Sequence, residues 1–187
     1  MRPLTHIVLH HSATDATLGS GDPEGAALWA AIERNHQKHW AKTVAGYICD
    51  YHFGVGPTGV VLAGQPLGLV AFNCGNARLN TVSIAVCFLG NFQIARMPAT
   101  QYAGGVQLLR FLSAYYSIPL AHIMLHREVP DERTGIPGFT ACPGRWFPSA
   151  AARTALQEHS GGASLRAVMS WCGTSGTPVY VDPWHAL

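Results

Sequence analysis

Side chains that bind soft or borderline metal ions stand at the ends of three short segments of this sequence. The apolar run Ile7-Val8-Leu9 ends in His10-His11, and the run Ile123-Met124-Leu125 ends in His126. A turn-rich segment then ends in Cys142-Pro143-Gly144 and offers a thiolate. Two imidazoles and a thiolate are a ligand set of catalytic zinc sites, in which water takes the fourth tetrahedral position. The sequence therefore predicts a catalytic zinc site.

Only one of the adjacent histidines His10 and His11 can face such an ion, because successive side chains of a strand point to opposite faces of the sheet. Their spacing alone does not choose between them. The pairs His6 with His10, and His122 with His126, would each share one face of a strand. They would lie about 13 Å apart along it, whereas zinc bonds are about 2.0 to 2.3 Å long. Neither pair can bind a single ion.

A lone histidine or cysteine is more often a packed core residue than a ligand. The five cysteines are odd in number and include no Cys-x-x-Cys pair, which is typical of reduced thiols. Cys142 differs from the others because Pro143 and Gly144 place it in a loop. The remaining four are predicted to be inert buried thiols: Cys49, Cys74, Cys87 and Cys172.

The segments that must position these residues alternate between strands and helices. Asp22 and Thr100 are predicted N-caps of the first two helices, with Pro23 as the first helical residue. The segment 82–89 is almost continuously apolar, which indicates a central strand buried on both faces. We expect an α/β protein with a mixed central β-sheet flanked by helices. Its predicted strands are 5–11, 47–55, 60–63, 82–89 and 121–129, and its predicted helices are 23–39, 100–116 and 145–159.

Length and charge set further limits. The 187 residues carry 12 Lys and Arg against 10 Asp and Glu, a net charge of +2 that is too small for a nucleic-acid-binding protein. No apolar run approaches the roughly 20 residues of a transmembrane helix, and no signal-peptide pattern follows Met1. We expect a monomer made in the cytoplasm. One domain should cover residues 1–160, and residues 161–187 should form an extension packed on it, a separate wall-binding element being the alternative.

Six short segments occur in the order seen in a known family. With them, the chain resembles the zinc-dependent N-acetylmuramoyl-L-alanine amidases, which include phage lysozyme-type amidases and the peptidoglycan recognition proteins. The likeness extends from about residue 5 to about residue 150. The segments are Val8-Leu9-His10-His11-Ser12-Ala13-Thr14, Tyr51-His52-Phe53, Ser83-Ile84-Ala85-Val86, Leu89-Gly90-Asn91-Phe92, His126-Arg127-Glu128-Val129 and Cys142-Pro143-Gly144-Arg145-Trp146-Phe147-Pro148.

The resemblance implies hydrolysis of the amide bond between the lactyl group of N-acetylmuramic acid and L-alanine. By position, it implies that Zn²⁺ is bound by His10, His126 and Cys142, with Tyr51 and Thr140 as catalytic helpers. The Tyr51 phenol would donate a hydrogen bond to the developing oxyanion, and the Thr140 hydroxyl would orient the water or the carbonyl. The donor of the proton to the leaving amine stays open, because other members have lysine at the position of Thr140.

Two departures from the family pattern concern residues that are expected to border the substrate-binding cleft. Asn73 stands where relatives have histidine, and a neutral amide can bind substrate but cannot shuttle a proton. We therefore predict Asn73 and the nearby Asn76 to be substrate-binding residues. The loop between His126 and Cys142 is longer than in compact relatives and is expected to raise one wall of the cleft.

The function predicted from these residues is that of a peptidoglycan amidase, a phage-type endolysin acting on the bacterial cell wall. A cytosolic amidase that recycles soluble muropeptides would share the same residues. A module that binds muropeptide without cleaving it is a second alternative, although such relatives lack the complete ligand set. A third is a metal-independent hydrolase with Cys142 as nucleophile.

Overall fold

The computed structural model describes residues 2–14, 21–40 and 44–157. Five strands form one sheet in the order β3-β2-β4-β1-β5. The strands β2, β4, β1 and β5 run parallel, and β3 pairs antiparallel with β2 at one edge. This mixed sheet confirms the predicted α/β architecture. The strand bounds are β1 His6–His11, β2 Phe53–Val55, β3 Val61–Ala63, β4 Ser83–Phe88 and β5 Ile123–Leu125.

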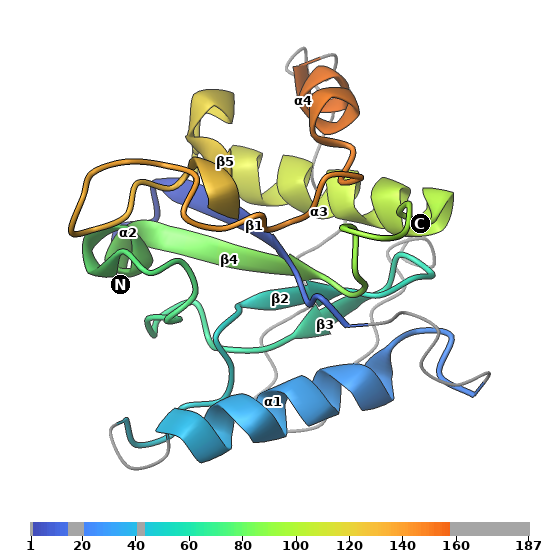
Figure 1. Ribbon diagram of the computed structural model, residues 1–187, viewed down its shortest axis with the longest axis horizontal. Coiled ribbons are helices and arrows are strands. Elements are labelled where there is room, and N and C mark those ends of the chain that lie inside the picture. Colours follow the sequence, from blue (N-terminus) through green and yellow to red (C-terminus); the bar gives the residue numbers. More distant parts are fainter. Residues whose placement is uncertain (1, 15–20, 41–43, 158–187) are drawn as a thin grey trace.

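Helices cover both faces of the sheet (Figure 1). On one face, Leu109 and Leu112 of α3 (Ala99–Tyr115) pack in a core cluster with Ile7 and Leu9 of β1. On the other face, Trp29 of α1 (Ala26–Trp40) packs with residues of β3 and β4. Because side chains alternate along β1, His10 points away from the α3 face. The helix α4 (Ser149–Gln157) lies beside α3.

The prediction of a central strand buried on both faces is confirmed by β4. All six of its residues are buried, and it lies between β2 and β1. Each fully buried Val or Ile side chain contributes roughly 1.5 to 3 kcal/mol of transfer free energy. This strand and its neighbour β1 therefore form the rigid base on which the loops at the strand ends are mounted.

The first helix begins later than predicted. Its first residue is Ala26, and Gly25 precedes it with a φ of 79°, a conformation that ends any continuous helix from Pro23. The prediction of Asp22 as the N-cap residue is therefore wrong in position, although its Oδ2 atom still accepts hydrogen bonds from the N–H groups of Ala27 and Leu28 in the first turn. Pro23 therefore belongs to the turn before the helix.

The start of α3 and the presence of a further helix also differ from prediction. Thr100 lies inside the first turn of α3, where its hydroxyl donates to the carbonyl of Pro57 at 2.7 Å, so it is not the N-cap. The unpredicted helix α2 (Ala77–Val82) occupies a stretch that has no helical periodicity in the sequence. Asn76 is its N-cap and accepts a hydrogen bond from the N–H of Leu79 at 3.0 Å.

The segment predicted as one strand over 121–129 is divided into three short elements. The 3-10 helix η1 (Leu120–His122) precedes β5, and a second 3-10 helix, η2 (His126–Glu128), follows it. The strand stops because the Glu128 carboxylate accepts the N–H of Leu125 at 2.9 Å and closes the turn. His122 is therefore not on one strand with His126. Its ring stacks on that of His6 at 4.4 Å.

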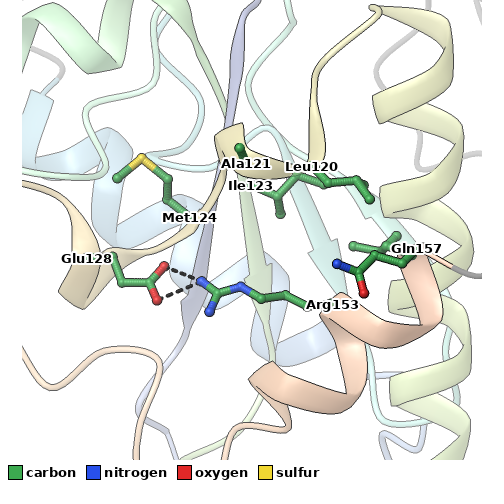
Figure 2. Close-up of a pocket in the computed structure, with 8 residues that line it drawn as sticks. Leu120, Ala121, Ile123, Met124, Glu128, Arg153 and Gln157 are labelled. Carbon is green, nitrogen blue, oxygen red and sulfur yellow. Dashed lines mark hydrogen bonds and ion pairs between the residues drawn. The ribbon is translucent and has the colours of Figure 1, made fainter.

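The last described helix also begins later than predicted. α4 begins at Ser149 and not at Arg145, because the Arg145 N–H is bound to the side-chain oxygen of Gln93 at 3.0 Å. Within α4, Arg153 forms an ion pair with Glu128 at 2.7 Å, on the wall of a groove between β5 and α4 (Figure 2). That groove contains none of the predicted site residues.

The predicted extension at 161–187 and the domain boundary at 160 lie outside the described residues. Within the described part of the chain, no helix combines the length and the apolar character that crossing a membrane requires.

Candidate metal centre

The two predicted histidine ligands meet because β1 and β5 are neighbouring parallel strands. Leu9 is paired with Leu125, so the residues that follow, His10 and His126, leave the same edge of the sheet side by side. Their ring centroids lie 4.5 Å apart. The carboxyl ends of parallel strands commonly carry the binding groups of α/β proteins. His10 is 1% exposed, and its neighbour His11 points to the other face, where its Nδ1 accepts the N–H of Phe92.

Cys142 is held opposite these rings by a turn that is attached on two sides. The Arg127 N–H donates to the carbonyl of Cys142 at 2.8 Å, and the Arg127 guanidinium donates to the carbonyl of Gly144 at 2.9 Å. Gly144 has a φ of 97°, and a Cβ atom there would lie 2.4 Å from the backbone of Phe92. Only glycine fits this position. The turn therefore directs the Cys142 thiol toward His10, with 3.9 Å between Sγ and Nδ1.

The geometry of this cluster approaches that of a tetrahedral zinc site. The ligand atoms of His10, His126 and Cys142 all lie within 4.8 Å of one another. Zinc bonds of about 2.3 Å to sulfur and about 2.0 Å to nitrogen at a tetrahedral angle require an S···N separation of about 3.5 Å, and Cys142 Sγ lies 3.9 Å from His10 Nδ1. The Nε2 atom of His126 is buried and has no hydrogen-bond partner among the described residues, a state that binding of a cation or a polar ligand relieves.

Burial sets the protonation states of the three side chains. It lowers the pKa of His10 well below its usual value, with a further contribution from His126. It also lowers the pKa of His126 to about 4, so both imidazoles are neutral and have a lone pair to offer at pH 7. Burial raises the pKa of the Cys142 thiol to about 11, although the His11 N–H and Arg127 oppose this.

These protonation states bear on the alternative in which Cys142 is a nucleophile. A thiol with a pKa of about 11 is protonated at pH 7 and reacts weakly. Nδ1 of His10 lies 3.9 Å from Sγ, which is a long hydrogen-bond contact even for sulfur. A bound cation would instead displace the proton, because metals bind the thiolate. The structure therefore favours Cys142 as a ligand.

Tyr51 lies beside the cluster, just before β2. Its ring is 5.2 Å from that of His10 and 6.3 Å from that of Trp29 on α1. Burial raises the pKa of Tyr51 well above its usual value. The phenol is therefore protonated at neutral pH and is a hydrogen-bond donor next to the predicted metal position.

Thr140 is located in the turn that presents Cys142. Its hydroxyl oxygen accepts the N–H of Cys142 at 3.2 Å, while the hydroxyl hydrogen remains available to donate. Its catalytic role stays a prediction.

Both predicted substrate-binding amides make hydrogen bonds within the chain. Asn73 Oδ1 lies 3.0 Å from His10 Nε2, and Asn73 Nδ2 donates to the carbonyl of Ala71. Asn76 caps α2 and donates through Nδ2 to the carbonyl of Pro130 at 3.0 Å. Asn73 is thus next to the metal ligands, and Asn76 joins α2 to the long loop. Their contact with substrate stays a prediction.

Two residues near the site were given no role from the sequence. Phe139, in the long loop before Cys142, places its ring edge-on against His126 at 5.4 Å and is 46% exposed. Arg127 attaches the Cys142 turn through its backbone and its guanidinium. Both roles depend on how the loop folds back on η2, which no local pattern indicates.

Two histidines and a cysteine at the carboxyl ends of parallel strands thus form a candidate metal centre on a mixed α/β sheet. Residues 1–145 match the sequence model of the family described as N-acetylmuramoyl-L-alanine amidase, and the chain belongs to that family. No curated protein sequence matches the chain.

Solved structures with the same fold come from bacteria, insects and a bacteriophage. The N-acetylmuramoyl-L-alanine amidase LysC from Clostridium intestinale matches with a TM-score of 0.62 and 21% identity, over 83% of this chain and 87% of that chain. Drosophila PGRP-LB matches with a TM-score of 0.62 and 20% identity, over 81% of both chains. The Ph2119 endolysin from a Thermus scotoductus bacteriophage has a TM-score of 0.57 and 20% identity, over 83% of this chain and 86% of that chain. At such identities these likenesses establish the fold alone.

Proposed function

We propose that this protein is a zinc-dependent N-acetylmuramoyl-L-alanine amidase that cleaves bacterial peptidoglycan as a phage-type endolysin. The observation that carries the proposal is the meeting of His10, His126 and Cys142, with ligand atoms within 4.8 Å of one another, in a chain of the amidase family. The expected substrate is peptidoglycan or a muropeptide, and the expected place of action is the cell wall.

The residues of the cluster would bind Zn²⁺ through two neutral imidazoles and one thiolate. The ion would supply a bound water with a pKa near 7 and would polarise the substrate carbonyl. The Arg127 backbone and the His11 N–H hold the thiolate in place, since the latter donates to Cys142 Sγ at 3.4 Å. Second-sphere hydrogen bonds of this kind orient metal ligands.

Tyr51 is proposed to stabilise the transition state. Its phenol keeps its proton at neutral pH and can donate a hydrogen bond to the amide oxygen as negative charge develops there. Thr140 is proposed to orient the attacking water or the carbonyl through its free hydroxyl hydrogen. Asn73 and Asn76 are proposed to border the substrate-binding cleft.

A recognition module that binds peptidoglycan without cleavage is the competing function. One similar structure is described as peptidoglycan recognition proteins LCa and LCx bound to tracheal cytotoxin, so the fold also occurs in proteins solved as ligand complexes. The complete ligand set of the present chain favours an enzyme, because a module that only binds has no need of three converging ligands with neutral imidazoles.

The test combines metal analysis with mass spectrometry of the products formed from purified cell wall. We expect about one zinc ion per chain and products with a new L-alanine amino terminus, both lost after chelation and restored by added zinc. Soluble muropeptides serve as a parallel substrate: a preference for them over the polymer would favour the recycling amidase. Active protein without zinc would overturn the mechanism, and wall binding without amine release would favour the recognition module.

A further inference from the structure

The side-chain amide of Asn73 has only one orientation that satisfies both of its neighbours. One end of the amide faces the carbonyl oxygen of Ala71 at 2.8 Å, and the other faces Nε2 of His10 at 3.0 Å. A carbonyl oxygen accepts hydrogen bonds and never donates them, so the amide NH₂ must face Ala71. The amide oxygen therefore faces His10.

This orientation determines the tautomer of His10. An amide oxygen can only accept, so Nε2 of His10 must carry the hydrogen that it donates to Asn73. In a neutral imidazole the other nitrogen, Nδ1, then has the free lone pair. Nδ1 is the atom that lies 3.9 Å from Cys142 Sγ, on the side where the ligands converge.

The segment that carries Asn73 is itself held by a buried side chain. Asn80, which is 6% exposed, accepts through Oδ1 from the N–H of Asn73 at 3.3 Å and from the N–H of Cys74 at 3.2 Å. The thiol of Cys74 donates to the same oxygen at 3.0 Å. The amide of Asn73 is thus fixed relative to β1 by contacts that continue into α2.

We propose that Asn73 is a positioning residue that holds His10 in the Nε2–H tautomer and so makes Nδ1 a zinc ligand. The inference rests on the proposed function for the identity of the ion. It goes beyond the predicted substrate contact, because it gives this side chain a role before any substrate binds. The relatives' histidine at this position would donate or accept according to its own protonation, whereas the amide oxygen of asparagine only accepts.

Two variants of Asn73 separate positioning from simple packing. Asn73→Leu keeps the approximate shape and removes the acceptor, so zinc affinity measured by chelator competition should fall by roughly 10- to 100-fold. Asn73→Asp keeps an acceptor toward His10 but turns a second oxygen toward the Ala71 carbonyl. It should lose stability in urea unfolding and yet bind zinc within a few-fold of the parent, or more tightly.

Gln101→Met is the matched control for loss of a buried amide. Gln101 is fully buried in α3 and donates to the carbonyls of Val55 at 2.8 Å and Leu89 at 2.9 Å, among core residues of the sheet. This variant should lose stability through its two missing hydrogen bonds while zinc affinity stays at the parent value. If zinc affinity instead falls in proportion to the loss of stability in all three variants, Asn73 acts only through packing. That result would overturn the proposal.

The tautomer can be observed directly by ¹⁵N NMR of the imidazoles in the zinc-free protein. His10 should give the Nε2–H pattern in the parent and in Asn73→Asp, and an averaged pattern in Asn73→Leu. Unchanged zinc affinity and an unchanged tautomer in Asn73→Leu would refute the positioning role even if the parent binds zinc and cleaves peptidoglycan. A parent protein that binds no zinc would instead refute the proposed function.

Discussion

The ring of Tyr51 lies against the ring of His10, with 5.2 Å between their centroids and an angle of 50° between their planes. Tyr51 also contacts Trp29 of α1, so the phenol is held between a helix and a predicted metal ligand. Tyr51 also packs against the core cluster of Trp29 and Cys87, so its hydroxyl must be tested separately from its ring. This relationship makes the phenol the first side chain to test.

Tyr51→Phe removes the hydroxyl and keeps the ring contacts. We expect kcat to fall by roughly 100- to 1,000-fold, the usual effect of removing one donor to an oxyanion, with zinc content and unfolding midpoint unchanged. The measurements are turnover on a soluble muropeptide, metal analysis and urea unfolding. Turnover near that of the parent would show that Tyr51 has only a packing role.

Cys142→Ser tests the thiolate as a ligand. A serine hydroxyl stays protonated near neutral pH and binds zinc poorly, so the ion should be lost or bound much more weakly and amide hydrolysis should disappear. Binding to purified cell wall should survive in part, because the rest of the surface is retained. Wall binding and amine release are measured on the same preparation, and hydrolysis at the parent rate would contradict the mechanism.

Thr140→Ser and Thr140→Val distinguish the hydroxyl from the shape of the turn. Serine keeps an oxygen that can accept the N–H of Cys142, and we expect turnover within a few-fold of the parent. Valine removes that oxygen and leaves the N–H without its partner, which costs about 1 to 3 kcal/mol if the group stays buried. It should lower both zinc affinity and kcat. Equal turnover in the two variants would limit Thr140 to a structural role.

The stability of the zinc-free protein should fall as the pH drops below neutrality, partly because of His52. Its Nδ1 accepts the N–H of Ala85 at 2.9 Å, and burial together with Arg2 lowers its pKa to about 3. The unfolded chain takes up this proton near pH 6.5, whereas the folded protein takes it up only near pH 3. The contribution of His52 to the free energy of unfolding is thus fully present above about pH 6.5. It declines as the pH falls below that value, by at most about 1.4 kcal/mol per pH unit.

Urea unfolding between pH 7 and pH 4 checks this dependence, with His52→Gln as the comparison. The variant loses the titrating group, so its free energy of unfolding should be lower at pH 7 but should change less steeply with pH. Parallel curves for the two proteins would show that His52 does not contribute to the slope.

Local sequence patterns are sufficient to predict much of the fold. The apolar run of β4 predicts a central strand because a segment buried on both faces must be apolar throughout. The sequence also indicates that Asp22 binds the start of the first helix, since its partners are only a few residues away. The first residue of that helix is wrong in the prediction, because Gly25 interrupts it. The predicted N-cap role of Thr100 is wrong because its hydroxyl donates to the carbonyl of the distant Pro57, a contact that rules for helix starts do not describe.

The sequence by itself determined which ligand types were available and which segments would carry them, because histidine and cysteine are recognised by chemistry and strands by local apolar patterns. Only the tertiary structure decided that Leu9 pairs with Leu125, which brings His10 beside His126, and that Asn73 turns its amide oxygen to His10. Strand order and loop closure arise from contacts between residues far apart in the chain. Such contacts are selected by the packing of the whole core, and no short stretch of sequence specifies them.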